Sequence, residues 1–150
     1  MQPQNGGIKA LRLVGNQLSS LPDLSLSFTA LRTLALASNG LQQLPADFGN
    51  LTTLTELNLL KNQLTDLPPS ICELTALTSL ELSSNFLASL PDGIGNLVNL
   101  PRLVVDSNQI KELPASFVKL KITHFSINAN RLEYFPSMSP PPFYLSLIHI

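Results

Sequence analysis

An asparagine recurs along this sequence at an almost constant interval, and this repeat constrains the fold more than any other feature. The step between successive asparagines is 23 residues, except for the last step, which is 22 residues. The six positions are Asn16, Asn39, Asn62, Asn85, Asn108 and Asn130. A period of this length is typical of solenoids, in which every repeat is one supersecondary unit.

Apolar residues keep fixed places around each asparagine. In LTELNLLKNQLTDLP (residues 54–68), leucines lie eight, five and three residues before Asn62 and two and five residues after it. The leucines before Asn62 alternate with polar residues, which predicts a short strand. Ile71, Leu74 and Leu77 follow at spacings of three, which predicts a helical or 3₁₀ turn on the opposite side. Each repeat is therefore predicted to be one coil of strand, turn and return.

A single coil buries too little apolar surface to offset the entropy lost on ordering about 23 residues at ~1–2 kcal/mol each. Stacking removes this difficulty, because neighbouring strands pair in parallel and each coil covers the leucines of the next. We therefore predict an α/β repeat, a curved solenoid with a parallel sheet on one side. The repeated asparagines are predicted to be structural, since their amides can bond backbone groups of the turn and of the adjacent coil.

The pattern LxxLxLxxNxLxxLPxxIxxL covers residues 8 to about 136 and resembles the leucine-rich repeat family. The Leu-Pro pair and the Ile-Gly-Asn-Leu segment at 94–97 are most similar to intracellular members, which include Ras-pathway leucine-rich scaffolds, plant intracellular Ras-group proteins and cell-polarity scaffolds. The resemblance implies short helical or 3₁₀ segments on the convex side. It also implies a binding platform without catalysis or cofactor, which receives a protein partner on its concave strand face.

The ends of the chain depart from the repeat pattern. Residues 8–136 form six predicted coils, and residues 137–150 are predicted to be an irregular return segment and a truncated seventh coil. In LSLIHI, Leu145, Ile148 and Ile150 fall on the apolar positions of the strand. The alternative is a chance apolar tail after the SPPP stretch. Repeat arrays need polar caps, and none is evident, so we expect a fragment of a longer protein.

Strand alternation predicts which side chains face outward on the concave side. Leu60 is the hypothetical anchor for a partner, in the shallow space left by Ala35 and Ala37, with Glu56, Glu81 and Arg102 setting orientation. The alternative is that a single exposed leucine carries no meaning. The full set of predicted partner-binding residues is Arg12, Val14, Ala35, Ala37, Glu56, Asn58, Leu60, Glu81, Arg102, Asp106 and His124.

An enzyme is not expected, although His124, Ser126 and Asp106 are predicted to share the outward face. An open sheet supplies no enclosed pocket and no oxyanion donors for a catalytic triad. One cysteine and two distant histidines lack metal-ligand spacing, and no phosphate-binding loop is present, so neither a metal, a cofactor nor a small-molecule substrate is evident.

Composition limits the class of partner and the cellular compartment that we expect for this protein. A net charge of −1 argues against nucleic acid as the partner. No apolar run approaches the ~18 residues of a membrane span, and the start, MQPQNGGIKA, lacks the apolar core of a signal peptide. The lone Cys72 excludes an internal disulfide, so we expect a cytoplasmic protein.

Two classes of function remain. The first is a scaffold that binds a signalling partner, with small-GTPase signalling suggested by the resemblance alone. The second is the sensing or substrate-recruiting region of a larger receptor, kinase or ubiquitin ligase.

Overall fold

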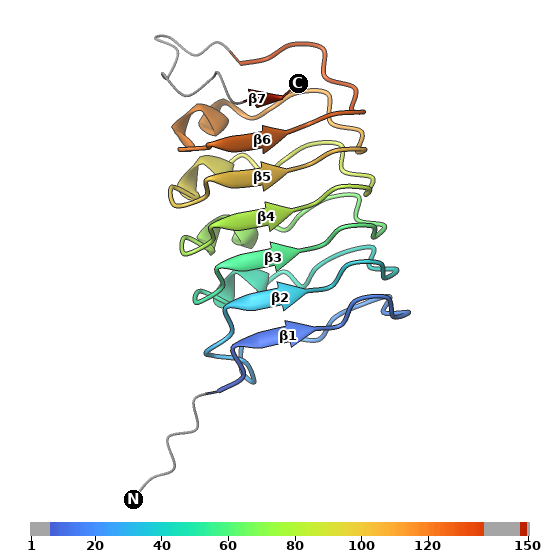
Figure 1. The fold of residues 1–150 in the computed structure, drawn as a ribbon, viewed down its shortest axis with the longest axis vertical. Coiled ribbons are helices and arrows are strands. Elements are labelled where there is room, and N and C mark those ends of the chain that lie inside the picture. The colour runs from blue at the N-terminus through green and yellow to red at the C-terminus, as the bar shows by residue number, and fades with distance from the viewer. Residues whose placement is uncertain (1–6, 137–147, 150) are drawn as a thin grey trace, which may run out of the picture.

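The computed structural model describes residues 7–136 and the backbone of 148–149, and it confirms the predicted solenoid. One short strand from each coil joins a single parallel sheet, in which the strands follow each other in chain order (Figure 1). The strands are β1 (Ala10–Arg12), β2 (Thr33–Ala35), β3 (Glu56–Asn58), β4 (Ser79–Glu81), β5 (Arg102–Val104), β6 (His124–Ser126) and β7 (Ile148–His149).

Short 3₁₀ helices occupy the return segments behind the sheet, and none of the described residues is in an α-helix (Figure 1). Apolar residues at spacings of three suit this tight helix, which turns about every three residues. The helices are η1 (Phe48–Asn50), η2 (Pro69–Glu73), η3 (Ile94–Asn96) and η4 (Ala115–Lys119).

Strand register follows the repeat without a slip. Leu57 of β3 lies between Leu34 of β2 and Leu80 of β4, and all three are almost completely buried. One-residue slips would turn these leucines toward solvent, so the burial of one face fixes the pairing. The backbone of Ile148 pairs with Phe125 of β6. Leu145 and Ile150, which belong to the predicted seventh coil, lie outside the described residues.

The repeated asparagines join neighbouring coils through their amides. Asn62 Oδ1 accepts a hydrogen bond from the Leu41 N–H at 3.1 Å, and its Nδ2 donates to the carbonyls of Leu36 and Leu59, both at 3.0 Å. Each of these bonds satisfies a backbone group at the point where the chain leaves the strand. The same pattern holds for Asn39, Asn85, Asn108 and Asn130. Asn16 differs, because it is exposed and makes one 3.4 Å bond to the Val14 carbonyl.

The residue before each of these asparagines has a left-handed backbone conformation. In the third coil this residue is Lys61, with φ of 55°. Only Gly15, in the first coil, is a glycine, although glycine adopts such angles without steric cost. The remaining left-handed residues are Ser38, Ser84, Ser107 and Ala129. This turn was not predicted from the sequence.

Candidate functional site

The register aligns side chains in columns on the side of the sheet that faces away from the leucine core. We call this side the concave face. One column contains Ala10, Thr33, Glu56, Ser79, Arg102 and His124, and the next contains Arg12, Ala35, Asn58, Glu81, Val104 and Ser126. Strands about 4.8 Å apart therefore bring together residues that are separated by a whole coil in the sequence.

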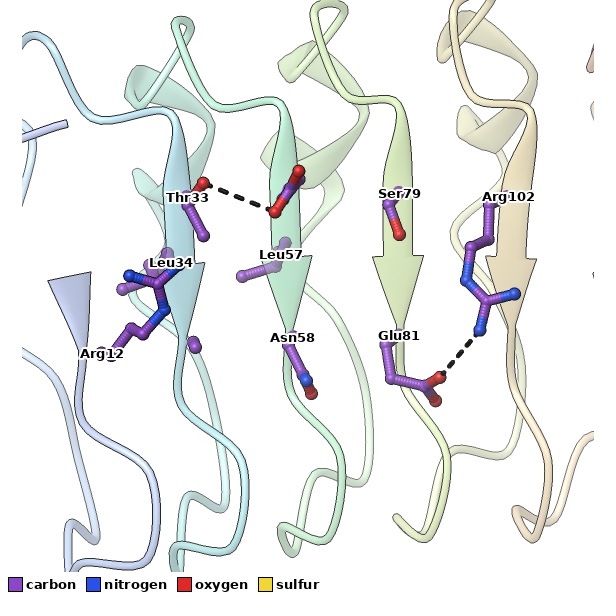
Figure 2. Close-up of a pocket in the computed structure, with 10 residues that line it drawn as sticks. Arg12, Thr33, Leu34, Leu57, Asn58, Ser79, Glu81 and Arg102 are labelled. Carbon is purple, nitrogen blue, oxygen red and sulfur yellow. Dashed lines mark hydrogen bonds and ion pairs between the residues drawn. The ribbon is translucent and has the colours of Figure 1, made fainter. Parts of the chain in front are cut away.

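The first five strands form a shallow hollow of about 310 Å³ on the concave face, here called the sheet hollow (Figure 2). Its floor is the strands themselves, because the Leu34 and Leu57 side chains are buried on the core face of the sheet, and charged and polar side chains stand around it. The lining residues are Arg12, Thr33, Leu34, Ala35, Glu56, Leu57, Asn58, Ser79, Glu81 and Arg102.

Among the residues that the structure describes, the sheet hollow contains two charged groups that pair with each other and two that do not. Arg102 lies 3.9 Å from Glu81, and this partly exposed ion pair closes one end (Figure 2). Thr33 Oγ1 donates a long 3.5 Å hydrogen bond to Glu56 Oε2. Within residues 7–136, neither Glu56 nor Arg12 forms an ion pair. One carboxylate and one guanidinium, two strands apart, are thus available to a partner.

Two side chains of the sheet hollow are held by the backbone beside them. Asn58 Oδ1 accepts a hydrogen bond from the Leu60 N–H at 3.0 Å, and Glu81 Oε1 accepts one from the Ser83 N–H at 2.9 Å. Groups held in this way lose less conformational freedom on binding. The centre of the hollow is therefore preorganised.

The predicted apolar patch around Leu60 requires a correction. Val14 is exposed (52%), but Ala37 is buried (5%), and Leu60 is only half-buried. The sheet hollow includes Ala35 but neither Ala37 nor Leu60. Ala37 lies two residues past the end of β2 and offers almost no surface. The sheet hollow is instead lined mainly by polar and charged side chains, among them Glu56 and Glu81.

Polar residues beside His124 form a structural network. Ser126 Oγ donates to Asp106 Oδ1 at 2.7 Å, and the Asn128 N–H donates to the same oxygen at 2.6 Å. In a catalytic triad the carboxylate orients the histidine, which in turn deprotonates the serine. Here the carboxylate binds the serine directly, and it ties β6 to the coil of β5.

Two other features bear on the kinds of site that are possible. In residues 7–136, no group of three His, Cys, Asp or Glu side chains is placed to hold a metal ion. The helices of the described segments are all too short and too polar to cross a bilayer.

Comparison with known proteins agrees with this geometry. A family model described as a leucine-rich repeat region matches residues 10–103, and a second model, described as leucine rich repeat, matches residues 75–132. No curated protein matches the chain.

Solved structures of several leucine-rich repeat proteins are similar to this fold. A Leptospira interrogans leucine-rich repeat protein has 32% identity and a TM-score of 0.81 over 86% of this chain and 33% of that chain. An internalin of Listeria monocytogenes has 28% identity and a TM-score of 0.75 over 83% of this chain and 36% of its own. The BIR2 ectodomain of Arabidopsis thaliana has 26% identity and a TM-score of 0.62 over 79% and 63%, respectively. The chain thus spans about a third of the length of the first two proteins.

The family model covers more than half of the chain, in a region whose strands, buried leucines and bonded asparagines all follow one repeat, and so this chain belongs to the leucine-rich repeat family.

Proposed function

We propose that the chain is a cytoplasmic interaction scaffold that binds a signalling protein through the sheet hollow of its concave face. Proteins with leucine-rich repeats generally mediate protein–protein interaction, and the fold is typically a non-enzymatic scaffold. The observation that supports the site is the pair of unpaired charges, Arg12 and Glu56, beside the preorganised Asn58 and Glu81. A partner of complementary charge would gain orientation and a faster association rate from these groups.

Charge reversal on one coil tests this site. Glu56→Arg changes the concave face, whereas Glu73→Arg makes the same substitution on η2, at the opposite side of the same coil. Both residues are exposed, so neither variant should unfold the protein. We expect proteins captured from lysate by the wild type to be lost with Glu56→Arg and kept with Glu73→Arg. Equal capture by the two variants would place the interaction elsewhere.

The signalling pathway requires a further comparison. The resemblance of the Leu-Pro and Ile-Gly-Asn-Leu segments to Ras-pathway scaffolds favours a small GTPase or one of its regulators. Capture should then differ between lysates supplied with GDP and lysates supplied with a non-hydrolysable GTP analogue. If the nucleotide has no effect on any captured protein, the small-GTPase proposal is wrong, although the scaffold proposal is not.

A second candidate function is supported by the comparisons. One similar structure is the ectodomain of a plant protein, and the first two similar chains are about three times as long as the aligned region. The array would then be the sensing or recruiting region of a larger receptor, kinase or ubiquitin ligase. Sequencing the transcript beyond the codon for Ile150 distinguishes the candidates, because a catalytic or receptor domain favours the second and further repeats favour the first.

A further inference from the structure

A second surface, separate from the concave face, lies where each coil turns after its asparagine. The residue directly after the asparagine is polar or glycine in five coils: Gln17, Gly40, Gln63, Gln109 and Arg131. In the remaining coil it is Phe86, whose aromatic side chain is 51% exposed. An exposed aromatic ring in a row of polar residues offers an apolar face that the fold itself does not use.

Phe86 borders a hollow of about 430 Å³, here called the flank hollow. Three successive coils contribute its lining, which consists of Gln42, Gln43, Gln63, Thr65, Asp66 and Phe86. Gly40 stands beside it, and a Cβ there would lie 3.9 Å from Gln63 Nε2, so glycine leaves that amide uncovered.

A second hollow of about 300 Å³ adjoins the first, because Gln43 and Asp66 line both. Pro45 and Pro68 add apolar ring surface to this second hollow. Together the two form a groove that crosses the flank of the first four coils. Two adjoining hollows suit a ligand made of several linked units rather than one small molecule.

The chemistry of the lining selects for hydroxyl groups. Each of the three glutamine amides can both donate and accept, as a hydroxyl does, and Asp66 can accept from two donors. Thr65 Oγ1 donates to Asp66 Oδ2 at 3.1 Å, which is the one side-chain hydrogen bond formed among the lining residues within 7–136. No lining residue is cationic, so an anionic ligand would find no counter-charge.

Backbone N–H groups along this flank are already bonded, which disfavours a peptide that adds as a strand. The Gln63 N–H donates to the Leu41 carbonyl at 2.9 Å, and the Phe86 N–H donates to the Leu64 carbonyl at 2.8 Å. A peptide that added as a strand would need such groups to be free. A saccharide needs only side-chain amides for its hydroxyls and one ring for its apolar C–H face.

We propose that the flank hollow binds a neutral oligosaccharide. Phe86 packs against the C–H face of one pyranose ring, Gln42, Gln43 and Gln63 exchange hydrogen bonds with its hydroxyls, and Asp66 accepts from a hydroxyl pair. The saccharide chain continues along the adjoining hollow over Pro45 and Pro68.

A matched pair of variants tests the proposal. Phe86→Gln installs the residue that three other coils carry at this place, so it preserves the fold while removing the ring. Val98→Gln makes the same kind of change at a residue of similar exposure (45%) outside both hollows. Maltohexaose, cellohexaose, laminarihexaose and chitohexaose serve as probes, with saturation-transfer NMR to detect binding and calorimetry to measure it.

At least one of these oligosaccharides is expected to bind the wild type and Val98→Gln equally, and to bind Phe86→Gln about tenfold more weakly. Thermal unfolding of both variants provides the check on folding. Glu56→Arg should leave saccharide binding unchanged, which separates this site from the concave face. The proposal is overturned if no probe binds the wild type at millimolar concentration. It is also overturned if Phe86→Gln binds the oligosaccharide as well as the wild type does. The same holds if that variant keeps oligosaccharide binding and loses only a protein captured from lysate.

Discussion

The backbone N–H of Gly49 donates to Ser70 Oγ of the next coil at 3.2 Å, and the absence of a side chain on Gly49 permits this approach. A Cβ on Gly49 would lie 2.1 Å from the Ser70 carbonyl oxygen. Gly95 and Ser116 repeat the arrangement. The Gly95 N–H donates to Ser116 Oγ at 3.1 Å, and a Cβ on Gly95 would lie 2.1 Å from the Ser116 carbonyl oxygen. Close packing on the convex side therefore joins η1 to η2 and η3 to η4.

Gly49→Ala is expected to lower the free energy of unfolding by about 2–3 kcal/mol, because the backbones of two packed coils must separate. Urea unfolding monitored by circular dichroism measures this change. Gly40→Ala is the matched control, since its Cβ would meet nothing nearer than the Leu18 carbonyl oxygen at 3.6 Å. The control should shift stability by less than about 0.5 kcal/mol. Equal shifts for the two variants would contradict the packing argument.

Asn62→Asp is expected to destabilise the protein by about 3 kcal/mol, because the carboxylate replaces an amide donor that faces the Leu36 and Leu59 carbonyls. The same substitution at Asn16, which is exposed and makes one long hydrogen bond, should cost less than about 0.5 kcal/mol. Chemical unfolding of both variants at neutral pH gives the comparison. A similar loss at both sites would show that the buried bonds to the adjacent coil add little.

The repeat pattern was sufficient to predict the strands and their register, because one face is buried and any slip would expose leucines. The left-handed turn was not predictable in the same way. Gly15, Lys61 and Ala129 occupy equivalent turn positions yet share no side-chain property, so tertiary bonding imposes this conformation rather than local preference. The burial of Ala37 was missed for a related reason, since period-two alternation stops where the strand ends. The flank hollow is formed by residues of three coils. Alignment of the repeats on their asparagines shows Phe86 as the one aromatic residue at its position, but it does not show the space beside that ring.

Replacing Lys61 with glycine is expected to stabilise the protein by up to about 1 kcal/mol. Its φ of 55° carries a steric cost for any residue with a Cβ, and removal of that cost outweighs the greater freedom of glycine in the unfolded chain. Lys111→Gly is the control: Lys111 is also exposed but has no positive φ, so this change should destabilise the protein. Thermal melting of the two variants under identical conditions shows whether each change stabilises or destabilises the protein. Destabilisation by both would contradict a steric cost at Lys61.

Arg102→Ala should alter stability by less than about 0.5 kcal/mol, because its ion pair with Glu81 is long and partly exposed. Chemical unfolding at low and at high salt measures the change in stability. The variant and the wild type should have nearly the same free energy of unfolding at both salt concentrations. Since Arg102 lines the sheet hollow, the variant separates binding from folding. We expect it to weaken capture of the concave-face partner, while unaltered capture would remove Arg102 from the binding surface.

Cys72 is expected to resist alkylation by iodoacetamide in the native protein at pH 8 and to react readily once the chain is unfolded in urea. Burial, followed by the carboxylates of Glu73 and Asp92, raises the pKa of the thiol, so the reactive thiolate is disfavoured in the fold.

The unfolded thiol ionises first as the pH rises through about 8.5, and the native state then loses stability relative to the unfolded state. Cys72→Ala lacks this titration and keeps the Cβ that Cys72 already has, so it introduces no new contact. The free energy of unfolding of the wild type should therefore fall more steeply than that of Cys72→Ala above pH ~8.5, and parallel pH profiles would show that the thiol ionises equally well in both states.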